Sequence, residues 1–206
     1  MKVVQLTAGA GGWYCGTCLR DNVLVRALRG QGIDAELVPL YLPLQVEGAS
    51  CSAGEPVLMS GVNVWLQHHV ALFRAIPRWV DAPLAHRGLL GLVGRGAGST
   101  SPSELGPLTL SMLEGSEGPI AKEVGRLVDH VEERRPDVVV LSNSLLAGLV
   151  APLRERLRVP VVVTIQGERA FVDAMGADAP AVWSSLASRL DRKSTRLNSS
   201  QLVISY

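Results

Sequence analysis

The chain opens with a short hydrophobic run that leads directly into glycines, MKVVQLTAGAGG over residues 1–12. A helical pattern follows from about Thr17 to Arg29. A strand, a glycine turn and a helix in this order are typical of α/β folds that handle nucleotides. Glycine lets the backbone turn tightly and approach a ligand closely, and the start of the helix offers unpaired N–H groups to a phosphate. The first twenty residues therefore predict one edge of a ligand site.

The second half of the chain repeats this rhythm of strand and helix. An amphipathic helix is predicted from Pro119 to Pro136, with a buried strand over 137–141 after it, then a leucine-rich helix over 145–157 and a further strand over 159–165. Strands that are separated by a dozen or more residues pair in parallel through right-handed crossovers. We therefore predict an α/β fold, a Rossmann-like, doubly wound and mainly parallel sheet with helices on both faces.

Ligands of such sheets bind beyond the carboxyl ends of the strands. The predicted ends are residues 8–12, 142–143 and 166–168. Other elements are less regular: a strand over 33–41, a strand over 61–66, a short helix over 68–76 and a helix over 105–113. In the first helix the pattern predicts an inward apolar face made of Leu19, Val23, Leu24, Ala27 and Leu28.

The composition of the chain argues against a nucleic-acid-binding protein, a membrane-spanning protein and a disulfide-rich protein. Apolar residues make up 47% and charged residues 19% of the 206 residues, and the net charge is +1. This balance gives no indication of a nucleic-acid partner. The longest strongly apolar stretch without charge, residues 138–153, is too short and too polar for a transmembrane segment. No secretory signal is visible, and three cysteines are an odd number for a disulfide framework, so we expect a cytoplasmic protein.

The last residues have a different character. Residues 191–206 carry no helical stripe and do not continue the α/β rhythm, and they resemble a translated sequencing-adapter tail. We therefore expect one domain over 1–190 and a non-native or disordered tail over 191–206. The alternative is a polar C-terminal arm.

The glycine loop does not complete a dinucleotide-binding motif. Tyr14 stands where G-x-G-x-x-G requires its third glycine, and no acidic residue ends the second predicted strand. Dehydrogenases that use a nicotinamide or flavin are thus disfavoured. Gly11 and Gly12 can still bring backbone N–H groups to phosphate oxygens, although a plain tight turn is the alternative. Trp13 can stack on a sugar ring or pack against the loop.

Cys15 and Cys18 form a C-x-x-C pair at the start of a helix, a position that can lower the pKa of a thiol. We favour a structural role in the loop over a redox role, and a redox role over metal binding. Zinc requires two further ligands, and Cys51, His68, His69 and His86 form no recognised cluster, so we expect no metal site. His68 and His69 are adjacent and cannot share a helix face, so one should pack and the other face solvent.

Several segments together resemble the amino-terminal lobe of the family-four glycosyltransferases, which have two Rossmann-like lobes around a cleft. They are AGAGGWYCGTCLRDN (8–22), LVPLYLP (37–43), GVNVWLQ (61–67), LSNSLLAG (141–148) and VVVTIQGE (161–168). The resemblance covers residues 1 to about 187, and it rests on the order and spacing of these segments. It implies a retaining hexosyltransferase that uses a nucleoside diphosphate sugar as co-substrate, with no metal and no other cofactor.

The resemblance also implies a division of roles. Gly11 and Gly12 would reach the donor diphosphate, and an acceptor, a small molecule or a glycan, would lie against Trp13, Tyr14, Asn143, Gln166 and Gly167. Most of the donor would be held by a carboxyl-terminal lobe that this chain lacks, so the chain alone is expected to transfer no sugar.

Glu168 is the candidate catalytic residue, because a carboxylate beyond a buried strand has few structural duties and can accept from an acceptor hydroxyl. Arg169 follows it where relatives of the family commonly have Asp. Helix capping is the favoured alternative for residues 142–144. Two other functions stay open: a non-catalytic α/β ligand-binding module, and a thiol oxidoreductase that uses Cys15 and Cys18.

Overall fold

A four-stranded, all-parallel sheet lies at the centre of the protein. The computed structural model describes residues 1–9, 15–42, 44, 46, 48–52, 57–59, 61–70, 72 and 102–193. The strands lie in the order β2-β1-β3-β4, and the predicted α/β class is confirmed. Their bounds are Lys2–Thr7 for β1, Asp34–Pro39 for β2, Val138–Leu141 for β3 and Val161–Val163 for β4.

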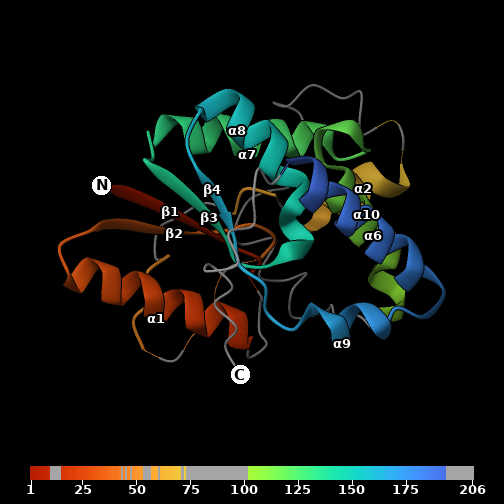
Figure 1. Ribbon diagram of the computed structural model, residues 1–206, viewed down its shortest axis with the longest axis horizontal. Coiled ribbons are helices and arrows are strands. Elements are labelled where there is room, and N and C mark those ends of the chain that lie inside the picture. Colours follow the sequence, from red (N-terminus) through yellow and green to blue (C-terminus); the bar gives the residue numbers. More distant parts are fainter. Residues whose placement is uncertain are drawn as a thin grey trace.

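Helices cover both faces of this sheet. Helix α1 (Gly16–Gly30) connects β1 to β2 on one face, and α7 (Ala121–Glu133) and α8 (Val150–Leu157) lie on the opposite face (Figure 1). From β1 the chain therefore winds outward to β2 on one side, and from β3 to β4 on the other. The point of reversal lies between β1 and β3, where Val3 pairs with Val138 and Leu6 with Leu141.

The face under α7 and α8 is apolar, as the sequence predicts. Val4 and Leu6 of β1 point toward it and are fully buried, as is Leu127 of α7. The predicted stripe of α7 is buried throughout. It consists of Ile120, Val124, Leu127, Val128 and Val131.

The face under α1 differs from the prediction. Cys18, Asp21, Asn22 and Val25 are the buried residues of this helix, whereas Leu19, Val23 and Leu24 are 46%, 53% and 40% exposed. The cause lies in β1, because alternate residues of a strand share a face. Val3, Gln5 and Thr7 lie on the face opposite Val4 and Leu6, and the latter two polar residues are buried. The predicted inward face was therefore wrong for Leu19, Val23, Leu24 and Ala27, whereas Leu28 is half-buried and packs against the apolar cluster of Val3, Val25, Ala35 and Leu37.

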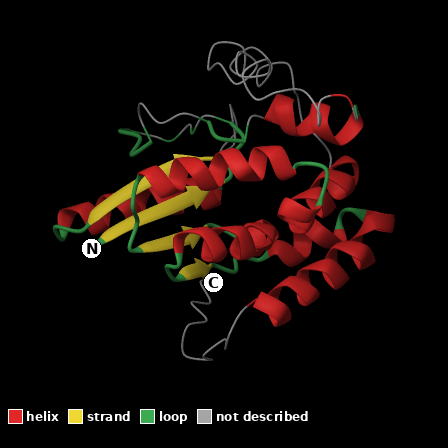
Figure 2. Cartoon of the chain, turned by 90° about the horizontal axis from the view of Figure 1, so that it is seen from above, coloured by secondary structure: helices red, strands yellow, loops and turns green. Residues whose placement is uncertain are grey.

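A second helical layer lies beyond the carboxyl ends of the strands (Figures 1 and 2). Gly148 allows its close packing, because a Cβ at this position would overlap the backbone carbonyl of Met112. The layer has its own core, which includes Leu113, Val172 and Val182. Its elements are α6 (Pro102–Glu114), η3 (Ser144–Leu149), α9 (Glu168–Asp173) and α10 (Ala179–Lys193), with the short turns η2 (Gly115–Glu117) and η4 (Gly176–Asp178).

Residues 61–66 do not form the predicted strand, because α2 spans Gly61–His69. The predicted helix over 68–76 thus overlaps only the end of α2, and most of it lies outside the described residues. Packing explains the difference. Gln67 donates to Oε1 of Glu123 at 2.8 Å, and His68 lies 2.8 Å from the hydroxyl of Ser111. These contacts with α6 and α7 outweigh the β propensity of the valines.

Glu123 is a charged residue on the buried side of α7, since it is 1% exposed and pairs with Arg126 at 2.8 Å. Within the described ranges, none of the helices combines the length and apolar character that a bilayer crossing requires.

Candidate functional site

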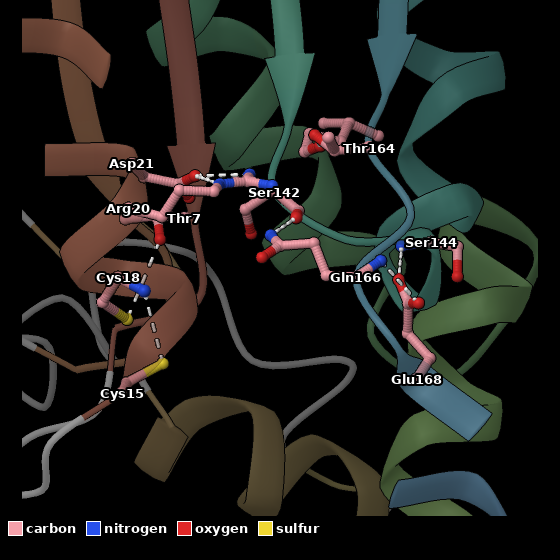
Figure 3. A network of polar contacts seen from close by, with 11 residues as sticks. Thr7, Cys15, Cys18, Arg20, Asp21, Ser142, Ser144, Thr164, Gln166 and Glu168 are labelled. Atoms are coloured by element: carbon pink, nitrogen blue, oxygen red, sulfur yellow. Dashed lines mark hydrogen bonds and ion pairs between the residues drawn. The ribbon is translucent and has the colours of Figure 1, made fainter. Parts of the chain in front are cut away.

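The ends of β1, β3 and β4 lie side by side at one edge of the sheet. The amide of Ser142 donates to the carbonyl of Leu6 at 3.0 Å, and the amide of Thr164 donates to the carbonyl of Leu141 at 3.0 Å. Thr7, Ser142 and Thr164 therefore follow one another across the sheet (Figure 3). This is the place where open α/β sheets bind their ligands.

The turn after β1 is fixed by its first glycine. Gly9 has a φ of +77°, and a Cβ there would overlap the carbonyl oxygen of Leu42. Only glycine meets both conditions. The predicted ligand residues Gly11, Gly12, Trp13 and Tyr14 come directly after it and lie outside the described residues, so their roles stay predictions.

Ser142, Asn143 and Gln166 are brought together between β3 and β4. The side-chain amide of Gln166 donates to the carbonyl of Ser142. The hydroxyl of Ser142, in a fully buried side chain, and the buried Oδ1 of Asn143 have no hydrogen-bond partner among the described residues. A buried polar atom without a partner is unfavourable by about 1–3 kcal/mol, which suits a position that a polar ligand completes.

Glu168 has a structural role that the sequence did not indicate. It is 7% exposed, and its two oxygens accept the backbone N–H groups of Ser144 and Gln166, each at 2.8 Å. The carboxylate thus caps η3 from a distant segment. The side chains of residues 142–144 make no such bond: Asn143 stands at the N-cap position without a side-chain cap. The predicted capping by these side chains was wrong.

Glu168 can still accept a hydrogen bond from a ligand while it caps η3, because each carboxylate oxygen has a second lone pair. Gly167, which precedes it, has a φ of +69° and turns the chain from β4 into α9. Arg169 points away from this place, because it is 87% exposed and lies 3.4 Å from Asp173 of α9.

A second polar group lies beside Thr7, on the α1 side of β1. Asp21 has no exposed surface, and its Oδ1 accepts from Arg20 at 2.6 Å. Burial raises the pKa of this carboxyl, and the neighbouring side chains of Arg20, Thr7 and Gln5 oppose part of the rise. Cys18 lies one turn earlier, 3.9 Å from the hydroxyl of Thr7.

Thr7 and Asp21 were missed in the sequence. Their signal was the alternation of Gln5 and Thr7 with Val4 and Leu6 in the first strand. That alternation predicts a polar face, which requires polar partners on the helix packed against it.

The two adjacent histidines behave as predicted, since His69 is exposed whereas His68 is partly buried against Ser111. Among the described side chains, no group of three or more His, Cys, Asp or Glu could hold a metal ion. Comparisons of the chain with protein-family models, with curated proteins and with solved structures found no match.

Proposed function

We propose that this chain is the acceptor-side lobe of a retaining glycosyltransferase, which transfers a hexose from a nucleoside diphosphate sugar to an acceptor hydroxyl. The observation that carries the proposal is the pair of buried, unpartnered oxygens on Ser142 and Asn143 at the reversal point of the sheet. The resemblance of residues 8–22 and 161–168 to the family supports the same reading. A separate donor-binding lobe would complete the enzyme.

The chemistry of the strand ends suits a sugar. A sugar hydroxyl both donates and accepts, so one hydroxyl can donate to Oδ1 of Asn143 while it accepts from the hydroxyl of Ser142. Gln166 would orient the acceptor through the Ser142 backbone that it already contacts. Glu168, held by two backbone N–H groups, would accept from the hydroxyl that attacks the donor. Positioning of this kind reduces the entropic part of the barrier.

The donor would be bound by the glycines that follow β1. Backbone N–H groups at Gly11 and Gly12 and the start of α1 would stabilise the leaving diphosphate, as preorganised donors do for developing negative charge. No metal is required in this proposal.

The test is a titration of the isotope-labelled chain with a panel of monosaccharides and inositols, followed by NMR. We expect amide shifts at residues 142–144 and 166–168. These shifts should be lost in Asn143→Ala and retained in Glu133→Gln, an exposed control on α7. Shifts confined to other segments, or none with any sugar, would contradict the proposal.

An assay for sugar transfer is a second, independent test of the proposal. With UDP-glucose or GDP-mannose as donor, we expect neither transfer nor hydrolysis by the 206-residue chain alone. Turnover by the purified chain would refute the division into two lobes.

A further inference from the structure

The face of α1 that packs on β1 carries three groups that can move protons. Cys15, Cys18 and Asp21 stand three residues apart, which places them in successive turns on one side of the helix. Thr7 of β1 lies against this side (Figure 3). The acceptor proposal uses none of the three, and the inference below does not depend on it.

Cys15 is placed as a nucleophile. It is the N-cap of α1, it is partly exposed, and its Sγ accepts the backbone N–H of Cys18 at 3.4 Å. A hydrogen bond from the Cys18 thiol and two backbone N–H groups lower the pKa of Cys15 to about 6, against burial and the charge of Asp21. The thiolate is the reactive form of cysteine, so Cys15 is primed to attack.

Cys18 is placed as the partner that acts second. It is 1% exposed, and its backbone N–H donates to the Cys15 sulphur at 3.4 Å, so the two cysteines lie together at the start of α1. The hydrogen bond to Cys15, together with burial, raises the pKa of Cys18. Cys18 therefore stays protonated, and it needs a base before it can act as a nucleophile.

Asp21 and Thr7 supply a route for that proton. The Thr7 hydroxyl donates to the Cys18 sulphur at 3.9 Å, and it also lowers the pKa of the Asp21 carboxyl. A hydroxyl oxygen can accept as well as donate, so a rotation of the Thr7 O–H toward Asp21 lets its oxygen take the Cys18 proton. Oδ2 of Asp21 makes no hydrogen bond of standard geometry among the described residues, although the side chain is completely buried. A buried carboxylate with a free oxygen beside a buried thiol is a proton acceptor in position.

We propose that Cys15 and Cys18 form a redox-active dithiol that exchanges with low-molecular-weight disulfides, with Thr7 and Asp21 as the proton relay of the second step. In the first step the Cys15 thiolate attacks one sulphur of glutathione disulfide. The disulfide bond of glutathione breaks, a Cys15–glutathione bond forms, and one glutathione thiolate leaves.

In the second step Cys18 displaces the remaining glutathione. The Cys18 proton moves to the Thr7 oxygen while the Thr7 proton moves to Asp21. The Cys18 thiolate attacks the Cys15 sulphur, a disulfide forms between the two cysteines, and the second glutathione thiolate leaves. Two thiols are oxidised, and one glutathione disulfide is reduced to two thiols. Asp21 afterwards returns its proton to solvent or to the leaving thiolate.

The test follows the reduced full chain after addition of glutathione disulfide, by intact mass and by mapping of disulfide-linked peptides. We expect a Cys15–Cys18 disulfide as the product. Cys18→Ser should instead accumulate one glutathione on Cys15, and Cys15→Ser should yield neither species. Cys51→Ser is the matched control, because Cys51 is the third free cysteine and its thiol donates to the backbone carbonyl of Asn22, away from Cys15 and Cys18 in the sequence.

The proton relay through Thr7 and Asp21 is tested by the rate at which the disulfide between Cys15 and Cys18 forms from the mixed disulfide, called ring closure here. Asp21→Asn and Thr7→Val should each slow the second step about tenfold or more near neutral pH, with the first step unchanged, whereas Thr7→Ser should close at the normal rate. A purely structural role for these residues would change both steps equally. If Asp21→Asn does not fold by circular dichroism, the pair of Thr7 variants decides.

Two results would overturn the proposal. One is a wild-type chain that forms no disulfide between Cys15 and Cys18 under excess glutathione disulfide. The other is alkylation of Cys15 by iodoacetamide at about pH 6.5 no faster than that of Cys51, where a thiolate at Cys15 should react at least about tenfold faster.

Discussion

The two faces of the central sheet are built from the same strands and differ in kind. Toward α7 and α8, β1 presents Val4 and Leu6, which belong to the largest apolar cluster of the described residues. Toward α1, the same strand presents Val3, which packs in a smaller apolar cluster with Val25. It also presents Gln5 and Thr7, which lie on the side where α1 buries thiol, carboxylate and amide groups. Consecutive residues of β1 point to opposite faces of the sheet. One face therefore carries the main apolar core, and the other carries the reactive groups of α1.

This contrast explains why α1 exposes its aliphatic residues. A helix with Leu19, Val23 and Leu24 turned inward would bury more apolar surface, but it would leave Gln5 and Thr7 against hydrocarbon. Buried polar groups without partners are more unfavourable than exposed leucines, so the polar side of the helix faces the polar side of the strand.

The largest expected effect is the loss of stability when a side chain is removed from the apolar core under α7 and α8. Leu127→Ala removes a fully buried side chain of α7 and should lower the free energy of unfolding by about 2–5 kcal/mol. The matched change on the other side is Leu24→Ala, which should lower it by less than about 1 kcal/mol, because Leu24 is 40% exposed. Urea denaturation measures both, and equal losses would contradict the assignment of the faces.

A smaller effect tests whether the polar strand ends also carry stability. Glu168→Gln places an amide group against one of two backbone N–H donors, so one bond is lost and the free energy of unfolding should fall by about 1–3 kcal/mol. Glu133→Gln, at an exposed position of α7, should change it by less than about 0.5 kcal/mol. If Glu168→Gln is as neutral as this control, the capping of η3 is not a structural duty.

The smallest expected effect is a change of the free energy of unfolding with pH. Burial raises the pKa of Asp21 above its ordinary range, so the folded chain holds this proton more tightly than the unfolded chain. The contribution of Asp21 to stability is therefore complete below about pH 4, the unfolded value, and declines as the pH rises toward the raised pKa. Asp21→Asn should remove this decline.

The measurement compares the free energies of unfolding of wild type and Asp21→Asn between about pH 4 and pH 6, below the ionisation of Cys15 at about 6. The advantage of wild type over the variant should shrink as the pH rises. Asp34→Asn, at the exposed first residue of β2, is the control. An advantage that grows with pH would mean that the carboxylate is favoured by its surroundings.

The sequence predicted the sheet because its strands are short apolar runs between long helical patterns. The parallel order and the stripe of α7 followed from that spacing. The facing of α1 could not be predicted from the helix alone, because its aliphatic stripe is real and only the polar residues of β1 decide which side is inward. In the same way α2 needed its contacts with Glu123 and Ser111, which come from segments more than 40 residues away.

The sequence predicted that the polar residues after β3 and β4 would lie close together, whereas the predicted roles of the site residues stay predictions. Asn143, Gln166 and Glu168 do meet at one edge, since parallel strands end together. The double bond of Glu168 to Ser144 and Gln166 could not be foreseen, because it requires α9 to turn back toward the start of η3. Thr7 and Asp21 were missed because each looked ordinary by itself, a strand residue and a helix residue.

The position of Gly9 at the end of β1 restricts which amino acids can replace it. Its backbone angle and the carbonyl of Leu42 together admit no side chain of any size. A library that samples all twenty amino acids at this codon, sorted for soluble folded protein, should return glycine and nothing else. Ala8, the residue before it, has no left-handed backbone angle and should tolerate replacement, so the contrast between the two positions would mark the point where β1 ends and its loop begins.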